Sequence, residues 1–287
     1  MCSGSTVANL TAIWVARDSK NITEVVASES AHLSIEKSAK ILGLKFRKVL
    51  TNSHGQIDSK QLGDLSNACL VLTAGTTTVG AIDSLELIGK AKWTHVDAAW
   101  AGPLRLSSKH THLLDNIELA DSIAISAHKW LFQPKDSALI LFKDTKTSNE
   151  AISFGGSYLT TPNIGLQGSR GASAIPLLAT LITLGKDGIV DLIEHSIEIA
   201  DKLCKELSKE ENLCVLESQQ TAITIFRPLN YTTEDFFKQL PEGMFSTCII
   251  DNQLWLRSVA VNPLADIDKI ISTVKKLLGK EAMLQSF

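Results

Sequence analysis

The stretch Asp121-Ser-Ile-Ala-Ile-Ser-Ala-His-Lys-Trp130 decides how the rest of this sequence is interpreted. Ile123 and Ile125 alternate with small residues, which is typical of a buried or half-buried strand. The strand leads into Lys129, which lies between a histidine and a tryptophan. Burial disfavours the charged form of an amine, and the neutral amine is a nucleophile that can form a Schiff base. Lys129 is therefore a candidate catalytic residue.

A second predicted strand carries a carboxylate near its end. The stretch Trp93-Thr-His-Val-Asp-Ala-Ala-Trp100 places Asp97 there, upstream of Lys129. Pyridoxal 5'-phosphate needs an acidic residue that pairs with its pyridinium nitrogen and a lysine that holds its aldehyde. The combination of Asp97 and Lys129 therefore suggests a site for this cofactor.

The composition limits the classes of protein that need consideration. The chain has 287 residues, of which 44% are hydrophobic, enough for a large α/β domain and a smaller one. A net charge of -3 without a dominant basic run argues against nucleic-acid binding. No run reaches the length of a membrane span, and no spacing of side chains suggests a metal site. The five cysteines form no CxxC pair, so we expect reduced thiols in a cytoplasmic protein.

The alternation of predicted strands and helices indicates an α/β fold. Residues 1–186 are expected to form a large domain and residues 187–287 a smaller α+β domain, joined through a long helix over 187–210. In the large domain the repeated order strand–helix–strand predicts a mainly parallel sheet with helices on both faces. Its expected strands cover 25–28, 45–50, 70–72, 93–100, the stretch from 121, and 137–142, and its expected helices end near 17 and 42 or cover 83–91 and 172–184. In the smaller domain we expect strands at 213–216, 222–226, 247–250 and 254–258, with helices at 233–239 and 265–278.

Two polar turns at predicted helix starts are candidate binding sites. At the start of the chain, free N–H groups and the hydroxyls of Ser5 and Thr6 can bind a phosphate, although a plain N-cap explains the same pattern. In the turn before the helix that ends near residue 42, His32 is either a cofactor contact or a capping or surface residue.

Two glycine-containing loops follow predicted strands. Residues 73–83 include Thr76 and Asp83 and follow a strand at the edge where open α/β sheets bind their ligands. Residues 153–171 include Tyr158 and Arg170 and are too rich in glycine for a regular element. A loop of that length inside a compact domain is usually functional or mobile.

Several of these stretches together resemble one known family. His95-Val-Asp-Ala-Ala-Trp-Ala-Gly102 and Ala120-Asp-Ser-Ile-Ala-Ile-Ser-Ala-His-Lys-Trp-Leu131 are similar to motifs of the group II pyridoxal-phosphate-dependent amino-acid decarboxylases. That family includes the glutamate, aromatic-L-amino-acid and 2,4-diaminobutyrate decarboxylases. The loop from Gly75, the turn at His32 and the start of the chain occur in the family's order. The resemblance implies the fold-type I pyridoxal-phosphate transferase fold, shared with aspartate aminotransferase.

The resemblance also implies roles around the cofactor ring. Lys129 would form the Schiff base, and Asp97 would keep the pyridine nitrogen protonated so that the ring accepts electrons. Ala99 would lie against one face of the ring and His32 would stack on the other. These roles make Lys129, Asp97 and His32 the expected catalytic residues.

The remaining implied contacts surround the cofactor's phosphate and hydroxyl groups. Ser5, Thr6 and Ser126 would hold the phosphate, with His128 beside it, where it would guide the substrate. The family usually has asparagine at the position of Ser126. The expected cofactor-binding residues are Ser5, Thr6, His32, Thr76, Asp83, Asp97, Ala99, Ser126, His128 and Lys129, with Thr76 and Asp83 near the ring hydroxyl and the lysine.

Two residues in the glycine-rich loop are candidates for contact with the substrate. Arg170 resembles an arginine that the family donates across a homodimer with shared active sites, where it would hold a carboxylate or a phosphate. A surface salt bridge explains it equally well. Tyr158 is a candidate proton donor, and its alternative role is structural.

The resemblance implies decarboxylation of an L-amino acid to the amine and CO2 through a Schiff base and a quinonoid, a reaction of amino-acid metabolism. Family members usually carry a further segment before the phosphate loop, whereas Met1 falls almost on that loop. Two alternatives therefore stay open. The chain could catalyse another reaction of the same cofactor, such as transamination, aldol cleavage or decarboxylation-dependent oxidation, or it could be a truncated, cofactor-binding remnant without turnover.

Overall fold

The computed structural model describes residues 1–160, 163–168, 171–218 and 220–284. The chain divides into two compact units. The first consists of Met1–Thr77 and Ala81–Val190, and the second of Thr78–Gly80 and Asp191–Phe287. The expected domain boundary at residues 186 and 187 lies close to this division.

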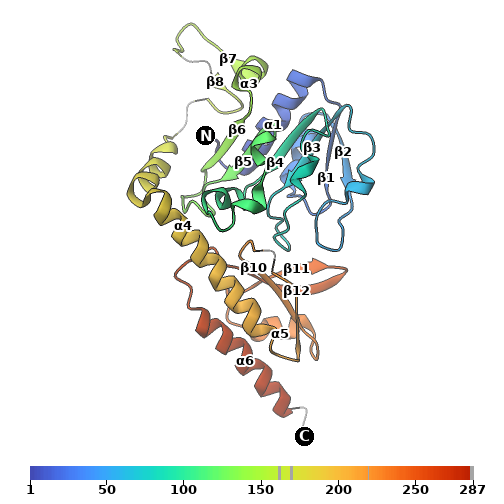
Figure 1. Cartoon of the computed structure of the whole chain (residues 1–287), viewed down its shortest axis with the longest axis vertical. Helices are drawn as coiled ribbons and strands as arrows, with labels where there is room; N and C mark the ends of the chain where they lie inside the picture. Colours follow the sequence, from blue (N-terminus) through green and yellow to red (C-terminus); the bar gives the residue numbers. More distant parts are fainter. Residues whose placement is uncertain (161–162, 169–170, 219, 285–287) are drawn as a thin grey trace. The chain divides into compact units, whose positions relative to one another are not determined.

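A six-stranded sheet with the order β2-β1-β3-β4-β5-β6 forms the centre of the first unit (Figure 1). The sheet confirms the predicted α/β class, because only β6 is antiparallel to its neighbour. Its strands are β1 (Glu24–Ser28), β2 (Lys45–Val49), β3 (Ala68–Thr73), β4 (Trp93–Asp97), β5 (Ser122–Ser126) and β6 (Ala138–Phe142).

Helices α1 (Ser5–Lys20) and α2 (Ser34–Ile41) pack on one face of this sheet. Ala8 of α1 joins a buried cluster with Ala124 of β5. Neighbouring residues of a strand point to opposite faces, so Ile125 faces the other side. There it lies against the 3-10 helix η3 (Gly102–Leu106), where a Cβ on Gly102 would be 2.9 Å from Ile125 Cγ1. The covering helix on this face of β5 is therefore short and closely packed.

The helix predicted over residues 83–91 is wrong. The structure has only the 3-10 helix η2 (Leu85–Leu87) there, and Gly89 follows with a φ of 83°. The carboxylate of Asp83 binds backbone N–H groups of other segments, which fixes the start of this region outside a helix. Short elements that the sequence did not predict are η1 (Ser59–Gln61), η4 (Thr111–Leu114), η5 (Ile117–Leu119), α3 (Thr145–Ile152), β7 (Ser153–Phe154) and β8 (Asn163–Ile164).

Helix α4 (Ala174–Leu207) contains the break that the sequence predicted between two helices. Gly185 has a φ of 64° and a ψ of -174°, which are not helical. Glycine adopts this conformation without the steric penalty of a Cβ. The first half of α4 belongs to the first unit, and most of the second half belongs to the second.

The second unit contains an antiparallel sheet with the order β11-β12-β10-β9. Its core combines Leu203 of α4, Phe226 and Leu256 of the sheet, Phe236 of α5 and Val274 of α6. This arrangement confirms the smaller α+β fold. Among the described residues, no helix combines the length and the apolar character needed to cross a membrane. The elements are β9 (Leu213–Val215), β10 (Ile223–Pro228), α5 (Thr233–Gln239), β11 (Ser246–Ile250), β12 (Gln253–Val259) and α6 (Ile267–Leu284).

Gly75, in the loop after β3, is expected to tolerate alanine poorly. Its φ is 96°, and a Cβ would lie 2.7 Å from Trp100 Cδ1. Gly89→Ala is the matched control, because Gly89 also has a positive φ but no atom within 4 Å of a Cβ. Backbone strain of roughly 1–3 kcal/mol applies to both variants. The clash adds roughly 1–3 kcal/mol in Gly75→Ala alone. Urea unfolding measures both losses, and equal losses would contradict the packing of Trp100 on this loop.

Candidate active site

The two main candidate residues lie at the same edge of the parallel sheet. Asp97 is the last residue of β4, and Lys129 follows the end of β5. These strands are parallel neighbours in which Asp97 pairs with Ala124. The carboxyl ends of adjacent parallel strands meet at one edge, where open α/β sheets bind ligands. Asp97 is buried, with 3% of its surface exposed, and Lys129 is half-buried.

The carboxylate of Asp97 is held by two donors. Asn9 Nδ2 of α1 donates to Asp97 Oδ2 over 2.8 Å, and the backbone N–H of Ala99 donates to Oδ1 over 3.1 Å. An ionised carboxylate offers about four acceptor positions. Asp97 therefore keeps acceptor capacity for a further donor, such as a protonated ring nitrogen.

Trp100 connects Lys129 with the loop after β3. Lys129 Nζ lies 5.9 Å from the centroid of the Trp100 ring, within the range of a cation–π contact. Trp100 also packs against Trp130, with ring centroids 4.5 Å apart, and against Gly75. The sequence reasoning noted Trp100 only as the end of a stretch and missed this contact with the candidate lysine.

The start of α1 has the features of an anion site. The N-cap residue is Gly4, without a side-chain capping bond, and the first turn carries no acidic residue. Ser5 and Thr6 are thus the first helical residues rather than the plain N-cap that sequence reasoning left open. The first N–H groups of a helix lack acceptors within the helix, and the helix dipole favours an anion there.

Strand pairing brings the start of α1 close to Ser126. Cys2 and Ala138 exchange two backbone hydrogen bonds, of 2.8 and 2.9 Å, and Ala138 pairs in register with Ser126. Ser126 Oγ lies 3.2 Å from His128 Nδ1 and 3.3 Å from Nε2. Burial, followed by the charge of Lys129, lowers the pKa of His128. The candidate phosphate residues therefore gather at one end of β5 and β6.

The sequence analysis did not identify two further hydroxyl groups at this edge. Thr73 Oγ1 and Ser137 Oγ are buried and have no hydrogen-bond partner among the described residues. Thr73 pairs in register with Asp97, and Ser137 precedes Ala138. Buried polar atoms are normally satisfied, so unsatisfied ones at a sheet edge indicate a polar ligand site.

The side chains of Thr76 and Asp83 both accept hydrogen bonds from backbone N–H groups. Thr76 Oγ1 accepts a hydrogen bond from the Ala81 N–H over 3.0 Å. Asp83 Oδ1 and Oδ2 accept from the N–H groups of Ile57 and Thr73 over 2.6 and 2.7 Å. Burial raises the pKa of Asp83 to about 6, and these backbone bonds oppose the rise. The structure thus gives both residues a structural role, and their contact with a cofactor stays a prediction.

Ala99 contacts the carboxylate of Asp97 directly, whereas His32 is connected to it through Ser34 and Asn9. His32 is exposed, and its Nδ1 lies 2.8 Å from Ser34 Oγ. Ala99 is buried, and its carbonyl oxygen accepts from the Ser126 N–H over 3.3 Å. The backbone of Ala99 thereby links the ends of β4 and β5.

Of the two candidates in the glycine-rich loop, the structure describes Tyr158. Tyr158 is 85% exposed, and its ring lies over Gly156. Its role as a proton donor stays a prediction. Arg170 lies outside the described residues.

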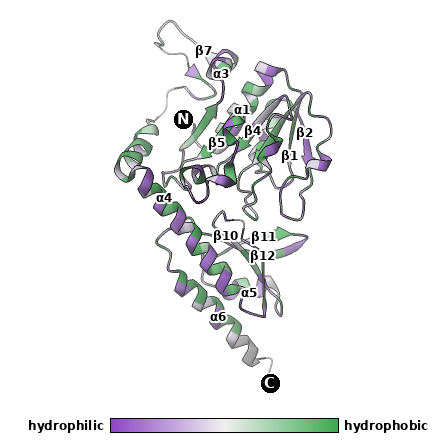
Figure 2. Ribbon diagram, in the orientation of Figure 1, coloured by the Kyte–Doolittle hydropathy of each residue, from purple (hydrophilic) through white to green (hydrophobic). Residues whose placement is uncertain are grey.

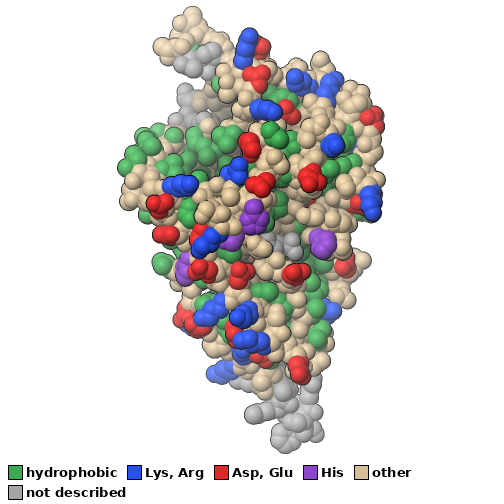
Figure 3. All heavy atoms as spheres, in the orientation of Figure 1, with side chains coloured by type: hydrophobic (Ala, Val, Ile, Leu, Met, Phe, Trp, Pro, Cys, Tyr) green, Lys and Arg blue, Asp and Glu red, His purple; other side chains and the backbone are tan. Residues whose placement is uncertain are grey.

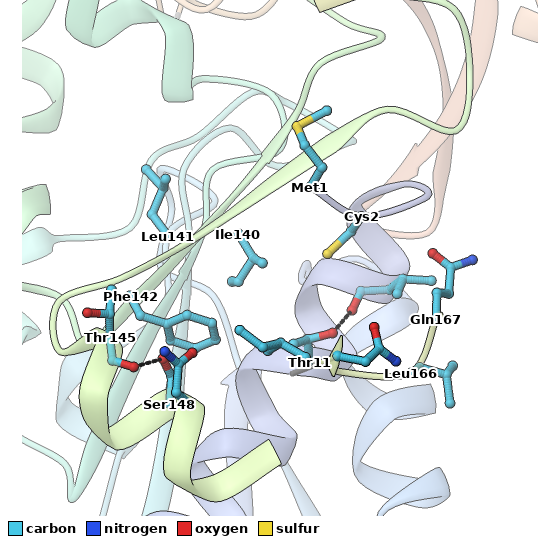
Figure 4. A pocket seen from close by; sticks show the side chains of 14 residues that line it. Met1, Cys2, Thr11, Ile140, Leu141, Phe142, Thr145, Ser148, Leu166 and Gln167 are labelled. Carbon is cyan, nitrogen blue, oxygen red and sulfur yellow. Dashed lines mark hydrogen bonds between the residues drawn. The ribbon is translucent and has the colours of Figure 1, made fainter. Parts of the chain in front are cut away.

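A separate cavity of about 480 Å³ lies between α1, β6 and the segment 145–167 (Figure 4). None of the predicted site residues that the structure describes lines it, and the described side chains that do line it include no carboxylate, imidazole, lysine or arginine. These side chains therefore offer no lysine to hold an aldehyde and no acid to pair with a ring nitrogen. The edge that carries Asp97 and Lys129 is the better candidate site.

Beneath Asp97 lies His95, which faces the same side of β4. His95 Nε2 lies 3.0 Å from Asn9 Oδ1, and Nδ1 lies 2.9 Å from Ser122 Oγ. Complete burial lowers the pKa of His95 to about 4, although the charge of Asp97 opposes this. The buried imidazole is therefore neutral.

Acid is expected to destabilise the first unit through His95. In the unfolded chain the pKa is 6.5 and in the folded chain about 4. The preference for the neutral ring is therefore fully present above pH 6.5 and is lost as the pH falls towards 4. Between pH 7 and pH 5 this residue alone removes about 2 kcal/mol from the free energy of unfolding.

Urea unfolding of wild type and His95→Gln at both pH values measures this contribution. Glutamine does not titrate and can still donate to Asn9. The stability difference between the two proteins should narrow by about 2 kcal/mol at pH 5. The opposite contribution of Asp83 is present in both proteins and cancels. A difference independent of pH would contradict the neutral, buried ring.

The chain is similar to known proteins over most of its length. It is 29% identical to the L-2,4-diaminobutyrate decarboxylase of Acinetobacter baumannii, over 91% of this chain and 59% of that protein. It is 30% identical to the aspartate 1-decarboxylase of Aliivibrio fischeri, over 79% of this chain and 50% of that protein. The chain thus spans between one half and two thirds of the length of these relatives.

The structure resembles that of mouse CSAD in apo form with a TM-score of 0.83, at 24% identity, over 96% of this chain and 70% of that one. This likeness confirms the predicted fold of the fold-type I enzymes. The family described as the pyridoxal-dependent decarboxylase conserved domain matches residues 15–228. Because this match covers well over half of the chain, the protein belongs to the pyridoxal-dependent decarboxylase family.

Proposed function

We propose that the chain catalyses the pyridoxal-phosphate-dependent decarboxylation of an L-amino acid to the amine and CO2. The observation that carries this proposal is the placement of a buried carboxylate, Asp97, and an amine, Lys129, at the ends of adjacent parallel strands. Membership of the decarboxylase family supports this reaction over others.

The residues at this edge fit the cofactor in the chemistry of their donors and acceptors. The start of α1, Ser126 and His128 suit a phosphate, and Asp97 keeps acceptor capacity for a ring N–H. The buried hydroxyls of Thr73 and Ser137 offer further donors to a polar ligand. When bound, pyridoxal phosphate supplies an electron-accepting ring that can take up the electron pair left by a departing carboxylate.

Each residue then has a defined task. Lys129 Nζ is the nucleophile for the cofactor aldehyde, and Asp97 holds a proton on the ring nitrogen. With the cofactor bound, the small side chain of Ala99 would leave room for the ring, and His32 would cover the opposite face. The first N–H groups of α1 and the hydroxyls of Ser5 and Thr6 bind the phosphate.

The alternatives predict different products. Transamination would yield a keto acid, aldol cleavage would yield an aldehyde, and a remnant without turnover would bind the cofactor and release nothing. The two relatives are named for a basic and an acidic amino acid, so the panel of substrates must include both. Purified protein is incubated with pyridoxal phosphate and acidic, basic and aromatic amino acids. The amounts of CO2 and of keto acid that are formed are then both measured. Keto acid without CO2 would overturn the proposal.

Lys129→Ala is expected to abolish covalent retention of the cofactor. Borohydride reduction followed by mass spectrometry of the peptides should place the cofactor on Lys129 in the wild type and nowhere in the variant. Lys135→Ala is the matched control, because Lys135 is an exposed lysine of the same segment. Retention of the cofactor by Lys129→Ala would show that another amine holds it.

Asp97→Ala is expected to weaken cofactor binding and to lower turnover by at least about 100-fold, because the ring nitrogen loses its acidic partner. The decarboxylation rate at saturating cofactor separates the two effects. Normal turnover in this variant would refute the role assigned to Asp97.

We also propose that the chain forms a homodimer through the first half of α4. Residues 172–185 contain no charged side chain. Ile175, Leu178 and Ile182 are 65%, 56% and 74% exposed, and they recur at helical spacing. Figure 2 colours much of this segment as hydrophobic, and Figure 3 shows hydrophobic side chains gathered over it. A helix that is apolar all round is normally buried, and a second copy of the chain would bury it. The idea that the dimer shares active sites depends on Arg170, which lies outside the described residues.

Ile182→Glu is expected to shift the chain from dimer to monomer, because a charge would lose water at the interface. Leu119→Glu is the control, since Leu119 is a half-exposed leucine of η5, outside α4. Sedimentation velocity should show that Ile182→Glu associates at least about tenfold more weakly than wild type. The control should associate as strongly as wild type. A monomeric wild type, or a dimer unaffected by both changes, would contradict this interface.

The five cysteines are all thiols in the structure. Disulfides persist in oxidising compartments and are rare in the cytosol. The thiols support the proposal that the protein works in the cytoplasm.

A further inference from the structure

Asn9 lies where several buried hydrogen bonds meet. It is on the face of α1 that packs against the sheet and has no exposed surface. Its Nδ2 donates to Asp97 Oδ2 over 2.8 Å and to Ser34 Oγ over 3.0 Å. Its Oδ1 lies 3.0 Å from His95 Nε2. A reversed amide would place its oxygen against the carboxylate, so these contacts fix its orientation.

The amide of Asn9 determines the proton position on His95. Asn9 Oδ1 can only accept, so His95 Nε2 carries the hydrogen. The neutral ring then accepts at Nδ1 from the hydroxyl of Ser122, and Ser122 Oγ accepts in turn from Trp93 Nε1 over 3.0 Å. The hydrogen bonds from Trp93 to Ser122, from Ser122 to His95 and from His95 to Asn9 are therefore all donated in the direction of Asn9.

The second hydrogen of Asn9 leads to His32 through Ser34. Ser34 is fully buried, its Oγ accepts from Asn9, and the same Oγ lies 2.8 Å from His32 Nδ1. The backbone N–H of Ser34 donates to His32 Nδ1 over 3.2 Å. Because this N–H can only donate, Nδ1 carries no hydrogen, and the Ser34 hydroxyl donates to it as well. In neutral His32 the hydrogen is therefore on Nε2.

We propose that Asn9 is a positioning residue for both sides of the cofactor: it orients the carboxylate of Asp97 and, through the hydroxyl of Ser34, directs a hydrogen bond to Nδ1 of His32, which carries its hydrogen on Nε2. This inference rests on the proposed function, in which Asp97 meets the ring nitrogen and His32 covers a ring face. With Nδ1 occupied, His32 turns a donor, Nε2–H, away from the core. The sequence reasoning had included Asn9 only as part of the start of the chain.

The tautomer can be measured without cofactor or turnover. Nitrogen NMR of the protein labelled with 15N-histidine separates a protonated from an unprotonated ring nitrogen. Wild type should show His32 with its hydrogen on Nε2, and His32→Gln assigns the signal. In Ser34→Ala the hydroxyl donor is lost while the backbone N–H at Nδ1 remains, so His32 should keep its hydrogen on Nε2 and its Nδ1 signal should move towards the value of a nitrogen without a hydrogen bond.

Ser38→Ala is the matched control. Ser38 is a buried serine of the same helix, and its hydroxyl donates to the backbone oxygen of Ser34 over 2.6 Å. Its removal should leave the Nδ1 signal of His32 unchanged. A wild-type hydrogen on Nδ1, or an Nδ1 signal that Ser34→Ala does not shift, would overturn the inference.

The affinity for the cofactor tests the other contact of Asn9, its hydrogen bond to Asp97. Asn9→Leu removes the donor to Asp97 at similar size, and the Kd for pyridoxal phosphate, measured by titration of protein fluorescence, should rise by roughly 10-fold or more. Ser38→Ala should stay within about threefold of wild type. Equal affinity for Asn9→Leu and wild type would refute the orienting role.

The outcomes separate this inference from the proposed function. If wild type fails to bind pyridoxal phosphate, the proposed function fails, while the His32 tautomer still decides the hydrogen-bond arrangement. If wild type binds and the Nδ1 signal of His32 is unaffected by Ser34→Ala, the inference fails alone. Should Asn9→Leu not fold, Ser34→Ala remains the deciding variant, because it leaves the bonds of Asn9 to Asp97 and His95 in place.

Discussion

A buried carboxylate is stable only when its oxygens are hydrogen-bonded, and the burial of Asp97 imposes this requirement on the first unit. One donor comes from the backbone just beyond β4, at Ala99, and the other from the side chain of Asn9 on α1. The first fixes how the chain turns after the strand. The second fixes the rotation of α1 about its axis, because Asn9 has to face the sheet. The position of the acid is thus coupled to the packing of the helix whose start is the proposed phosphate site.

Helix α1 therefore combines an apolar contact with a polar one. Ala8, Ala12 and Ile13 are fully buried, and Asn9 lies among them. A polar residue on such a face lowers stability unless every partner is present, and Asn9 has acceptors and a donor in Asp97, Ser34 and His95. The small alanines allow the helix to approach the sheet closely enough for these bonds. Packing and hydrogen bonding consequently require the same distance between α1 and β4.

Much of the fold could be predicted from the sequence because its strong patterns are local. The apolar run that became β3 and the alternation that became β5 are visible in a few residues, and Gly185 marks the break in α4. The candidate edge followed from the rule that strand ends meet, together with the rare combination of Asp97 and Lys129. The region 83–91 failed because its apolar spacing imitates a helix, whereas the bonds of Asp83 to distant backbone exclude one.

The residues that the sequence did not reveal act through partners far along the chain. Asn9 meets Asp97 across 88 positions, and the Trp100 contacts with Gly75 and Lys129 join separate loops. No local period encodes such pairs, since each depends on the strand order and on the face to which a side chain points.

Asp83 has a structural role that the resemblance to the family did not show. Its place after a strand suggested a cofactor contact, yet each of its oxygens accepts a backbone N–H from a different segment. The carboxylate of Asp83 therefore connects the backbone at residue 57 to the end of β3. Burial raises the pKa of this carboxyl group to about 6. Ionising it in that place is unfavourable, so the two backbone bonds are what make the charged form tolerable near neutral pH. Asp83 thereby holds the end of β3, where Thr73 pairs with Asp97, and it shapes the site through the backbone.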